Sequence, residues 1–174
     1  MKNFLVVVDM QKDFVDGALG TAEAVAVVPS VVKKIRGFEG EIFVTLDTHG
    51  DDYLKTAEGM HLPVKHCVRG SVGWKLDPNV FEALEGKKYT IVEKPTFGSL
   101  KLPRLISDQA DGEPFSVELI GLCTDICVVS NALILKASFP EAPVTVDAAC
   151  CAGVTPEKHE AALQTMRSCQ IKVV

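Results

Sequence analysis

Hydrophobic residues in this chain gather in short runs that alternate with longer, more polar segments. The runs are rich in valine and isoleucine and are too short for typical helices, so they predict buried β-strands. The expected strands cover residues 3–9, 41–47, 88–94, 115–122, 142–150 and 169–174. Because most of these runs are continuously apolar, we expect both faces of the sheet to be covered.

Helical patterns lie between the strands, at residues 29–36, 80–84, 99–107, 128–137 and 156–167. Thr155 followed by Pro156 is typical of a helix start, with a capping hydroxyl and proline in the first turn. Strands that alternate with helices predict an α/β fold, here a three-layer α/β/α arrangement with a six-stranded, mostly parallel sheet. The length of 174 residues and the 47% hydrophobic content predict a single domain over residues 1–174.

Composition narrows the class of function. The net charge is −5, with acidic and basic residues interspersed, so no basic stripe marks a nucleic-acid partner or an anionic membrane. The longest apolar runs, such as residues 4–8, are far shorter than a membrane span. The first residues lack the features of a signal peptide, so we expect a cytoplasmic protein. A small molecule is the expected partner.

Reactive side chains follow the ends of several expected strands. In open parallel sheets, ligands bind outside the carboxyl ends of the strands. Asp9, Asp47 and Lys94 each end a strand, and a turn bearing Cys123 and Cys127 follows another. Two acids, a lysine and a thiol are therefore expected to converge at one edge of the sheet.

Cys127 is the candidate nucleophile among six cysteines. It precedes an expected helix, whose N-terminal amides and dipole favour a thiolate and can receive an oxyanion. Lys94 would stabilise the thiolate further, and a nearby carboxylate would carry the proton. The alternative is a buried thiol that only packs, with Asp125 capping the helix. Disulfides are rare in the cytoplasm, and the chain has no CxxC pair.

The long polar segment 48–78 contains a possible metal site. A loop of this length in a compact domain is usually functional or mobile. Imidazoles combined with carboxylates suit Zn²⁺, Fe²⁺ or Mn²⁺ better than Ca²⁺ or Mg²⁺. The alternative is a solvated loop with surface histidines. The candidate ligands in and beside this segment are Asp47, His49, Glu58, His61 and His66.

The chain resembles the isochorismatase-like cysteine hydrolases, a superfamily that includes nicotinamidases. The resemblance lies in Asp9 of VVVDMQKDF, Lys94 of VEKPTFGSL and Cys127 of GLCTDICV, and it extends to DAACCAGVTPEKHEAALQTM. It implies an Asp–Lys–Cys triad in which Cys127 attacks an amide carbon. It also implies a cis peptide at Leu122–Cys123, with the backbone amides of Cys123 and Cys127 as the oxyanion hole.

The resemblance also implies which metal ligands to expect. Nicotinamidases carry D-x-H after the second strand and a further histidine just before a cysteine, and Asp47, His49 and His66-Cys67 match this pattern. The remaining ligand varies between histidine and glutamate in the family, and we expect Glu58, with His61 as the alternative. Isochorismatases lack this set. The implied cofactor is one divalent ion, zinc first and iron or manganese otherwise, and the implied reaction is hydrolysis of nicotinamide to nicotinate and ammonia.

One departure from the family concerns the substrate. Many nicotinamidases have a tryptophan shortly before the last histidine ligand, whereas this chain has HLPVKH without an aromatic residue. Phe14 and Phe97 are the expected contacts of the substrate ring, and Trp74 either lines the pocket or packs elsewhere. The alternatives are the same machinery acting on another small amide or carbamoyl compound, or a catalytically silent scaffold. We also expect a homo-oligomer.

Overall fold

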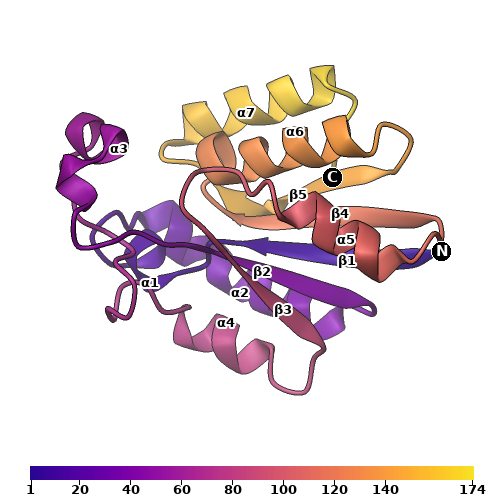
Figure 1. Cartoon of the computed structure of the whole chain (residues 1–174), viewed down its shortest axis with the longest axis horizontal. Coiled ribbons are helices and arrows are strands. Elements are labelled where there is room, and N and C mark those ends of the chain that lie inside the picture. Colours follow the sequence, from indigo (N-terminus) through magenta and orange to yellow (C-terminus); the bar gives the residue numbers. More distant parts are fainter.

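The computed structural model describes residues 1–174 and is built around one six-stranded sheet (Figure 1). The strands are β1 (Lys2–Val8), β2 (Glu41–Asp47), β3 (Tyr89–Lys94), β4 (Phe115–Leu122), β5 (Val144–Ala152) and β6 (Lys172–Val173). Their order across the sheet is β3-β2-β1-β4-β5-β6. Every neighbouring pair is parallel, which confirms the expected sheet and makes it wholly parallel.

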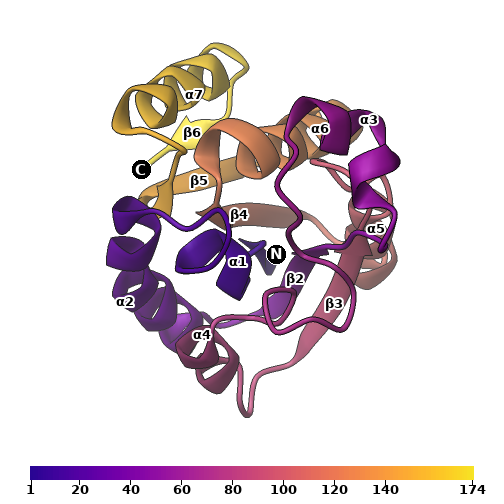
Figure 2. The ribbon, with the colours of Figure 1, turned by 90° about the vertical axis from the view of Figure 1, so that its left-hand side faces the viewer.

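Helices cover both faces of the sheet, which confirms the three-layer α/β/α architecture (Figures 1 and 2). On one face lie α1 (Lys12–Val15), α2 (Ala22–Gly37) and α4 (Pro78–Ala83), and on the other lie α5 (Leu102–Ala110), α6 (Val129–Ser138) and α7 (Pro156–Ser168). Successive strand residues point to opposite faces. Thus Leu5 and Val7 of β1 join the core beside α2, whereas Val6 and Val8 join the core beside α6.

Several element boundaries differ from the sequence prediction. The helix expected at residues 29–36 begins at Ala22, because the Thr21 hydroxyl accepts a hydrogen bond from the Ala24 amide and caps the helix there. Pro29 therefore lies inside the helix. The helices expected at 80–84 and 99–107 become Pro78–Ala83 and Leu102–Ala110. The last strand shortens to Lys172–Val173, the two residues in register with Thr145 and Val146 of β5.

The long segment after β2 carries two short helical turns, η1 (Tyr53–Lys55) and α3 (Ala57–His61), and no strand. Figures 1 and 2 show α3 standing away from the sheet. The Tyr53 hydroxyl donates a hydrogen bond to the Leu62 carbonyl at 2.9 Å and thereby links the start of η1 to the residue that follows α3. The segment returns beside β2 through a bridge between His49 and Val68.

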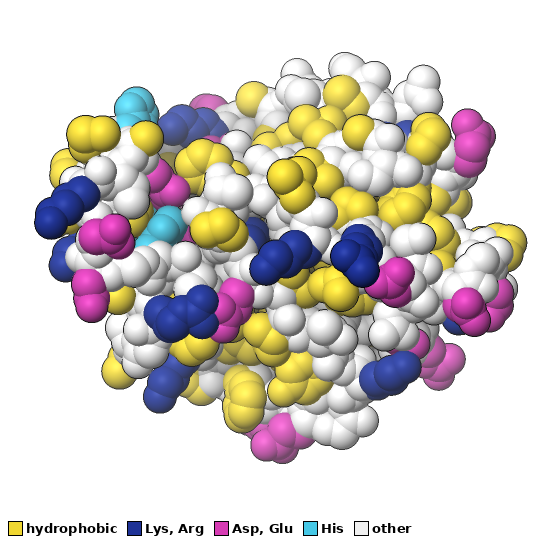
Figure 3. Space-filling model, viewed as in Figure 1, with side chains coloured by type: hydrophobic (Ala, Val, Ile, Leu, Met, Phe, Trp, Pro, Cys, Tyr) yellow, Lys and Arg dark blue, Asp and Glu magenta, His cyan; other side chains and the backbone are white.

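The face of the molecule seen in Figure 3 has no extended patch of one charge sign, because acidic and basic side chains are interspersed there. None of the helices has both the length and the apolar character needed to cross a membrane.

Gly121 of β4 lies very close to its partner Val8 of β1. Its φ is +116°, and a Cβ built there would lie 2.1 Å from the carbonyl oxygen of Val8. Only glycine combines this backbone conformation with this closeness. Gly121 stands next to the turn that bears Cys123, and Val8 precedes Asp9, so this contact sets the distance between two parts of the candidate site.

We predict that Gly121→Ala lowers the free energy of unfolding by about 3 kcal/mol or more, because it combines backbone strain with overpacking against backbone atoms. The control is Gly37→Ala, where a Cβ meets no atom within 4 Å. This control should change stability by less than about 1 kcal/mol. Urea unfolding of both variants measures the difference, and equal stabilities would contradict the assignment of Gly121.

Candidate active site and metal centre

Asp9, Lys94 and Cys127 meet at the carboxyl edge of the sheet, as their positions at strand ends predict. Asp9 follows β1, Lys94 ends β3, and Cys127 lies in η2 (Thr124–Val128), a π-helical turn after β4. The Lys94 Nζ atom lies 2.6 Å from Asp9 Oδ2 and 3.4 Å from Cys127 Sγ. All three residues are buried. The arrangement places a carboxylate, an ammonium and a thiol in one contact group.

Two further contacts hold this group in place. The Thr45 hydroxyl on β2 donates to Asp9 Oδ1 at 2.6 Å, and the Asp9 amide donates to the Thr45 carbonyl. Asp9 itself has a φ of 47°, so the chain turns sharply directly after β1. The Lys94 ammonium also donates to the Thr96 carbonyl at 3.1 Å. The Asp9 carboxylate and the Lys94 ammonium are therefore each held by a further hydrogen bond in addition to the ion pair between them.

Burial and neighbouring charges together set the pKa values of Lys94 and Asp9. Burial alone would lower the pKa of Lys94, but Asp9, Cys127 and Asp47 together raise it, so the ammonium stays charged. Burial raises the pKa of Asp9 and outweighs the opposite effect of Lys94. A carboxylate with a raised pKa is suited to accept and return a proton.

The expectation that Cys127 has a lowered pKa is wrong for this arrangement. Burial raises the pKa of the thiol well above its ordinary value, and the negative charge of Asp9 adds to this, while Lys94 opposes both. The local sequence suggested a stabilised thiolate because it showed a helix start but not the depth of the site. The raised pKa favours the protonated thiol at Cys127, and Asp9 is a carboxylate close to it.

The turn between β4 and α6 has the backbone that the resemblance implies. The peptide between Leu122 and Cys123 is cis. The Cys123 carbonyl accepts hydrogen bonds from the amides of Ile126 and Val128, both at 3.1 Å. Asp125 does not cap its own helix, because its carboxylate accepts a hydrogen bond from the Val154 amide at 2.9 Å. The alternative capping role of Asp125 is thus replaced by a link to the segment before α7.

Asn131 and His159, which the sequence analysis did not single out, also hold the turn. The Thr124 hydroxyl lies 2.8 Å from His159 Nδ1 on α7. Asn131 is fully buried, and its amide nitrogen donates to the Cys127 carbonyl at 2.8 Å. Its oxygen accepts from the Ser99 amide at 2.9 Å. Only a polar residue inside an apolar helix pattern could have indicated Asn131, and no local signal indicated His159.

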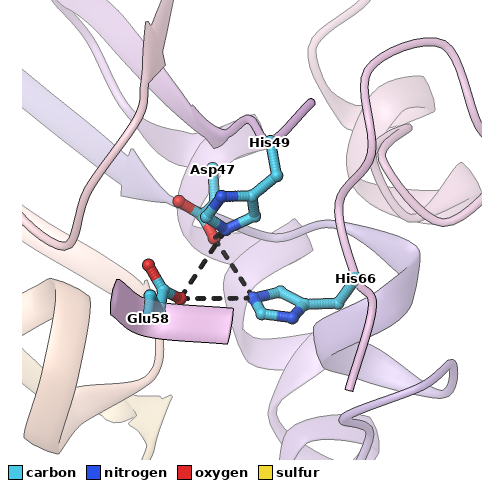
Figure 4. A group of neighbouring side chains, drawn as sticks. All are labelled: Asp47, His49, Glu58 and His66. Carbon is cyan, nitrogen blue, oxygen red and sulfur yellow. Dashed lines mark hydrogen bonds and ion pairs between the residues drawn. The ribbon is translucent and has the colours of Figure 1, made fainter. Parts of the chain in front are cut away.

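Four candidate metal ligands converge beside this group (Figure 4). Their ligand atoms all lie within 4.8 Å of one another, and they come from Asp47, His49, Glu58 and His66. Glu58 Oε1 is 3.7 Å from Nε2 of both His49 and His66. Two imidazole nitrogens and two carboxylate oxygens fit a divalent transition ion. His61, the alternative to Glu58, is exposed and lies outside the group.

Asp47 belongs to both halves of the site. Its Oδ2 atom lies 2.9 Å from His49 Nε2 and 3.5 Å from His66 Nε2. Its Oδ1 atom lies 3.3 Å from Lys94 Nζ. One carboxylate thus connects the candidate ligands with the buried lysine beside the thiol.

A small cavity separates the thiol from the candidate ligands. Its volume is about 50 Å³, well below the roughly 300–1,000 Å³ of pockets for drug-sized ligands. Most of its wall is apolar, and the lining residues are Phe14, Leu19, Asp47, Glu58, Leu62, His66, Phe97, Cys123, Ile126 and Cys127. Residues of the cysteine turn and of the candidate ligand group therefore line the same cavity.

Both expected ring contacts lie at this cavity. The Phe14 ring centroid is 5.5 Å from that of His66, and Phe97 is 43% exposed. Trp74, in contrast, packs elsewhere: its indole nitrogen donates to the Thr48 hydroxyl at 2.9 Å, and it lines a different hollow. Lys34 is one of the residues that line a larger hollow of about 690 Å³ elsewhere on the molecule. That lysine is paired with two carboxylates there, far from the thiol.

Comparisons with known proteins agree with this fold. A family model described as the isochorismatase domain matches residues 3–174. No curated protein matches the sequence significantly. A nicotinamidase/pyrazinamidase from Bacillus subtilis is a similar solved structure, with 24% identity, 100% coverage of both chains and a TM-score of 0.85.

Two further solved structures are similar over almost their whole lengths. The pyrazinamidase of Pyrococcus horikoshii in complex with zinc is 26% identical, with 100% of this chain and 99% of that chain covered and a TM-score of 0.81. An isochorismatase-like hydrolase from Alkaliphilus metalliredigens is 24% identical, with 99% and 94% covered and a TM-score of 0.77. Since the family model spans residues 3–174, the chain belongs to the isochorismatase family.

Proposed function

We propose that this protein is a metal-assisted cysteine amidohydrolase that converts nicotinamide to nicotinate and ammonia. The observation that carries the proposal is the placement of two groups across one small cavity. Cys127, with a carboxylate and an ammonium beside it, lines this cavity together with Asp47, Glu58 and His66, three members of the group of four convergent ligand atoms. Similar structures named nicotinamidase or pyrazinamidase, one of them in complex with zinc, support this choice.

In the proposed reaction, Cys127 Sγ forms a bond to the amide carbon while Asp9 accepts the thiol proton. Asp9 then returns this proton to the leaving nitrogen, the C–N bond breaks, and ammonia departs. Water then attacks the resulting thioester, the C–S bond breaks, and Asp9 passes one proton of the water to the sulfur, which restores the thiol. The product acid ionises to the carboxylate and releases the other proton. Lys94 keeps its charge throughout and balances the negative charge that passes between Asp9 and the sulfur.

The backbone of the turn completes the chemistry. We assign the amides of Cys123 and Cys127 to the oxyanion that forms when the thiol attacks. The hydrogen bonds from Asn131 to the Cys127 carbonyl and from Ile126 and Val128 to the Cys123 carbonyl keep this turn rigid. A preorganised turn does not need to rearrange as charge develops.

The ligand group would hold one divalent ion, with Asp47, His49, Glu58 and His66 as its protein ligands. Such an ion supplies a Lewis-acidic binding point for a ring nitrogen of the substrate. Phe14 and Phe97 would contact the ring, and the ring would then present its carboxamide to Cys127. Zinc is our first choice of ion because one similar structure contains it, with iron or manganese as alternatives.

A second candidate function is hydrolysis of another small amide or carbamoyl compound by the same groups. The observation that favours it is the aliphatic side chain of Leu62 in the cavity wall, within the segment where many nicotinamidases have tryptophan. Ammonia release from a panel of small amides, with nicotinamide and pyrazinamide included, decides between the two functions. No turnover on any amide would indicate the silent scaffold instead.

We predict that Cys127→Ala reduces ammonia release from nicotinamide by at least about 10³-fold, because the attacking atom is removed. Its urea unfolding midpoint should remain close to that of the unmodified protein. Cys123→Ala is the matched control, since its assigned role belongs to the backbone, and it should keep activity within about tenfold. Substantial turnover by Cys127→Ala would overturn the assignment of the nucleophile.

We predict that Lys94→Met slows alkylation of Cys127 by iodoacetamide at neutral pH. Without the ammonium, burial and Asp9 act unopposed on the thiol, so its pKa rises further and the thiolate fraction falls. Lys34→Met is the control, because Lys34 is also paired with two carboxylates but lies outside the site. Peptide mass spectrometry follows the rate at Cys127, and an unchanged pH profile in Lys94→Met would place the lysine outside the reaction.

We predict that chelation removes turnover on nicotinamide and that Zn²⁺, Mn²⁺ or Fe²⁺ restores it. His49→Ala should lose metal and turnover together, whereas Cys127→Ala should lose turnover and retain metal. His61→Ala is the control for a nearby exposed histidine and should retain both. Full activity in exhaustively chelated protein would contradict the metal-assisted mechanism.

Metal retention should also fall in mild acid. A histidine ligand binds as a neutral imidazole, so protons compete with the ion for it. Burial lowers the pKa of His66, but its contacts, those with Asp47 foremost, together outweigh burial and raise that pKa above its ordinary value, so this competition grows as the pH falls from neutral into mild acid. Elemental analysis after dialysis across this range measures the loss.

A further inference from the structure

The backbone of Asp47 has a strand partner on one side only. It pairs with Lys94 of β3, at the last position of that ladder. On the other side, β1 ends at Val8, which pairs with Thr45. Asp47 lies two residues beyond this last pair, so the ladder between β1 and β2 does not reach its amide and carbonyl. A buried backbone without partners is costly, and another group must satisfy it.

The side chain of Gln11 takes the place of the missing strand. Its Nε2 atom donates to the Asp47 carbonyl at 2.8 Å, and its Oε1 atom accepts from the Asp47 amide at 2.7 Å. Its Nε2 atom also donates to the Trp74 carbonyl at 2.8 Å. Gln11 is fully buried. The carboxamide therefore holds both backbone groups of Asp47 and links them to the far end of the long segment.

Gln11 does not cap the helix that it precedes. It occupies the N-cap position of α1, where a short polar side chain normally caps the helix. Its side chain makes no capping hydrogen bond and is directed to Asp47 instead. The backbone around it is held as well, since the Lys12 amide donates to the Lys75 carbonyl and the Asp13 amide to the Gly73 carbonyl. Backbone hydrogen bonds therefore hold the segment from which the Gln11 side chain reaches Asp47.

We propose that Gln11 is a positioning residue that sets metal affinity through the backbone of Asp47. The inference rests on the proposed metal site. Asp47 has to aim Oδ2 at the two histidines while Oδ1 faces Lys94, and this requires a fixed orientation of its Cα–Cβ bond. Gln11 fixes that bond by holding the amide and the carbonyl on either side of it. Residues that orient ligands typically change metal affinity by about 10–100-fold when they are replaced.

The test compares Gln11→Leu with Asn131→Leu. Each substitution removes a fully buried carboxamide that makes three hydrogen bonds, but Asn131 holds the nucleophile turn and the loop at Phe97 instead of Asp47. Zn²⁺ binding to purified, chelator-treated protein is measured by competition with a chromophoric chelator. Urea unfolding of the same samples measures stability.

We expect Gln11→Leu to weaken Zn²⁺ binding by about 10–100-fold and Asn131→Leu to leave it within about threefold, while both lose similar stability. Gln11→Met, which retains the length of the side chain, should weaken binding in the same range and serves if the leucine variant does not fold. Equal Zn²⁺ affinity in the unmodified protein and the Gln11 variants would overturn the inference and leave the metal site standing. An equal weakening in Asn131→Leu would overturn it too. Absence of Zn²⁺ binding by the unmodified protein would instead remove the proposed metal site, and the inference with it.

Discussion

The ion pairs of the buried Lys94 ammonium are the interaction on which the rest of the site depends. Its side chain is fully buried, and such a charge is stable only with close counter-charges. Asp9 at 2.6 Å and Asp47 at 3.3 Å supply them. Removing one member of a buried pair typically costs about 3–5 kcal/mol. The three residues therefore hold one another in place, and the thiol of Cys127 is fitted against a cation that cannot move away.

Sheet order explains why these residues meet. The order β3-β2-β1-β4 makes four strands adjacent that are far apart in the sequence, and all four end at the same edge. The close approach of Gly121 to Val8 then brings the cysteine turn near Asp9. β1, β2 and β4 are almost continuously buried toward these ends, whereas β3 is an edge strand whose first three residues are exposed. Asp9 and Cys127 thus follow two adjacent strands in the interior of the sheet.

The ligand half of the site is built differently. Asp47 ends a strand, but His49, Glu58 and His66 lie in the long segment between β2 and α4. Glu58 comes from α3, which stands away from the sheet, and its side chain is 21% exposed, more than those of the other three ligands. This half depends on polar links such as those of Gln11. The shared Asp47 connects the half that contains the thiol with the half that contains the candidate ligands.

The sequence by itself determined the strands and the residues at their ends. Continuous apolar runs indicate buried parallel strands, and such strands end at one edge of the sheet. This allowed the sequence to predict a site formed by Asp9, Asp47, Lys94 and Cys127. Asp47, His49 and His66 could be found from their spacing and from the family resemblance. Thr155 was readable as a helix cap because capping is a local interaction, and its hydroxyl does accept from the Lys158 amide.

Tertiary structure alone decided the remainder. Glu58 enters the ligand group and His61 stays exposed because of the direction in which α3 leaves the sheet, which no local pattern encodes. The pKa of Cys127 depends on burial and on the charges of three other elements, so a helix start could not reveal it. Trp74 packs against Thr48, and Gln11 replaces a strand, because segments distant in sequence meet there. Local patterns specify which elements form, whereas burial and long-range hydrogen bonds decide what each side chain faces.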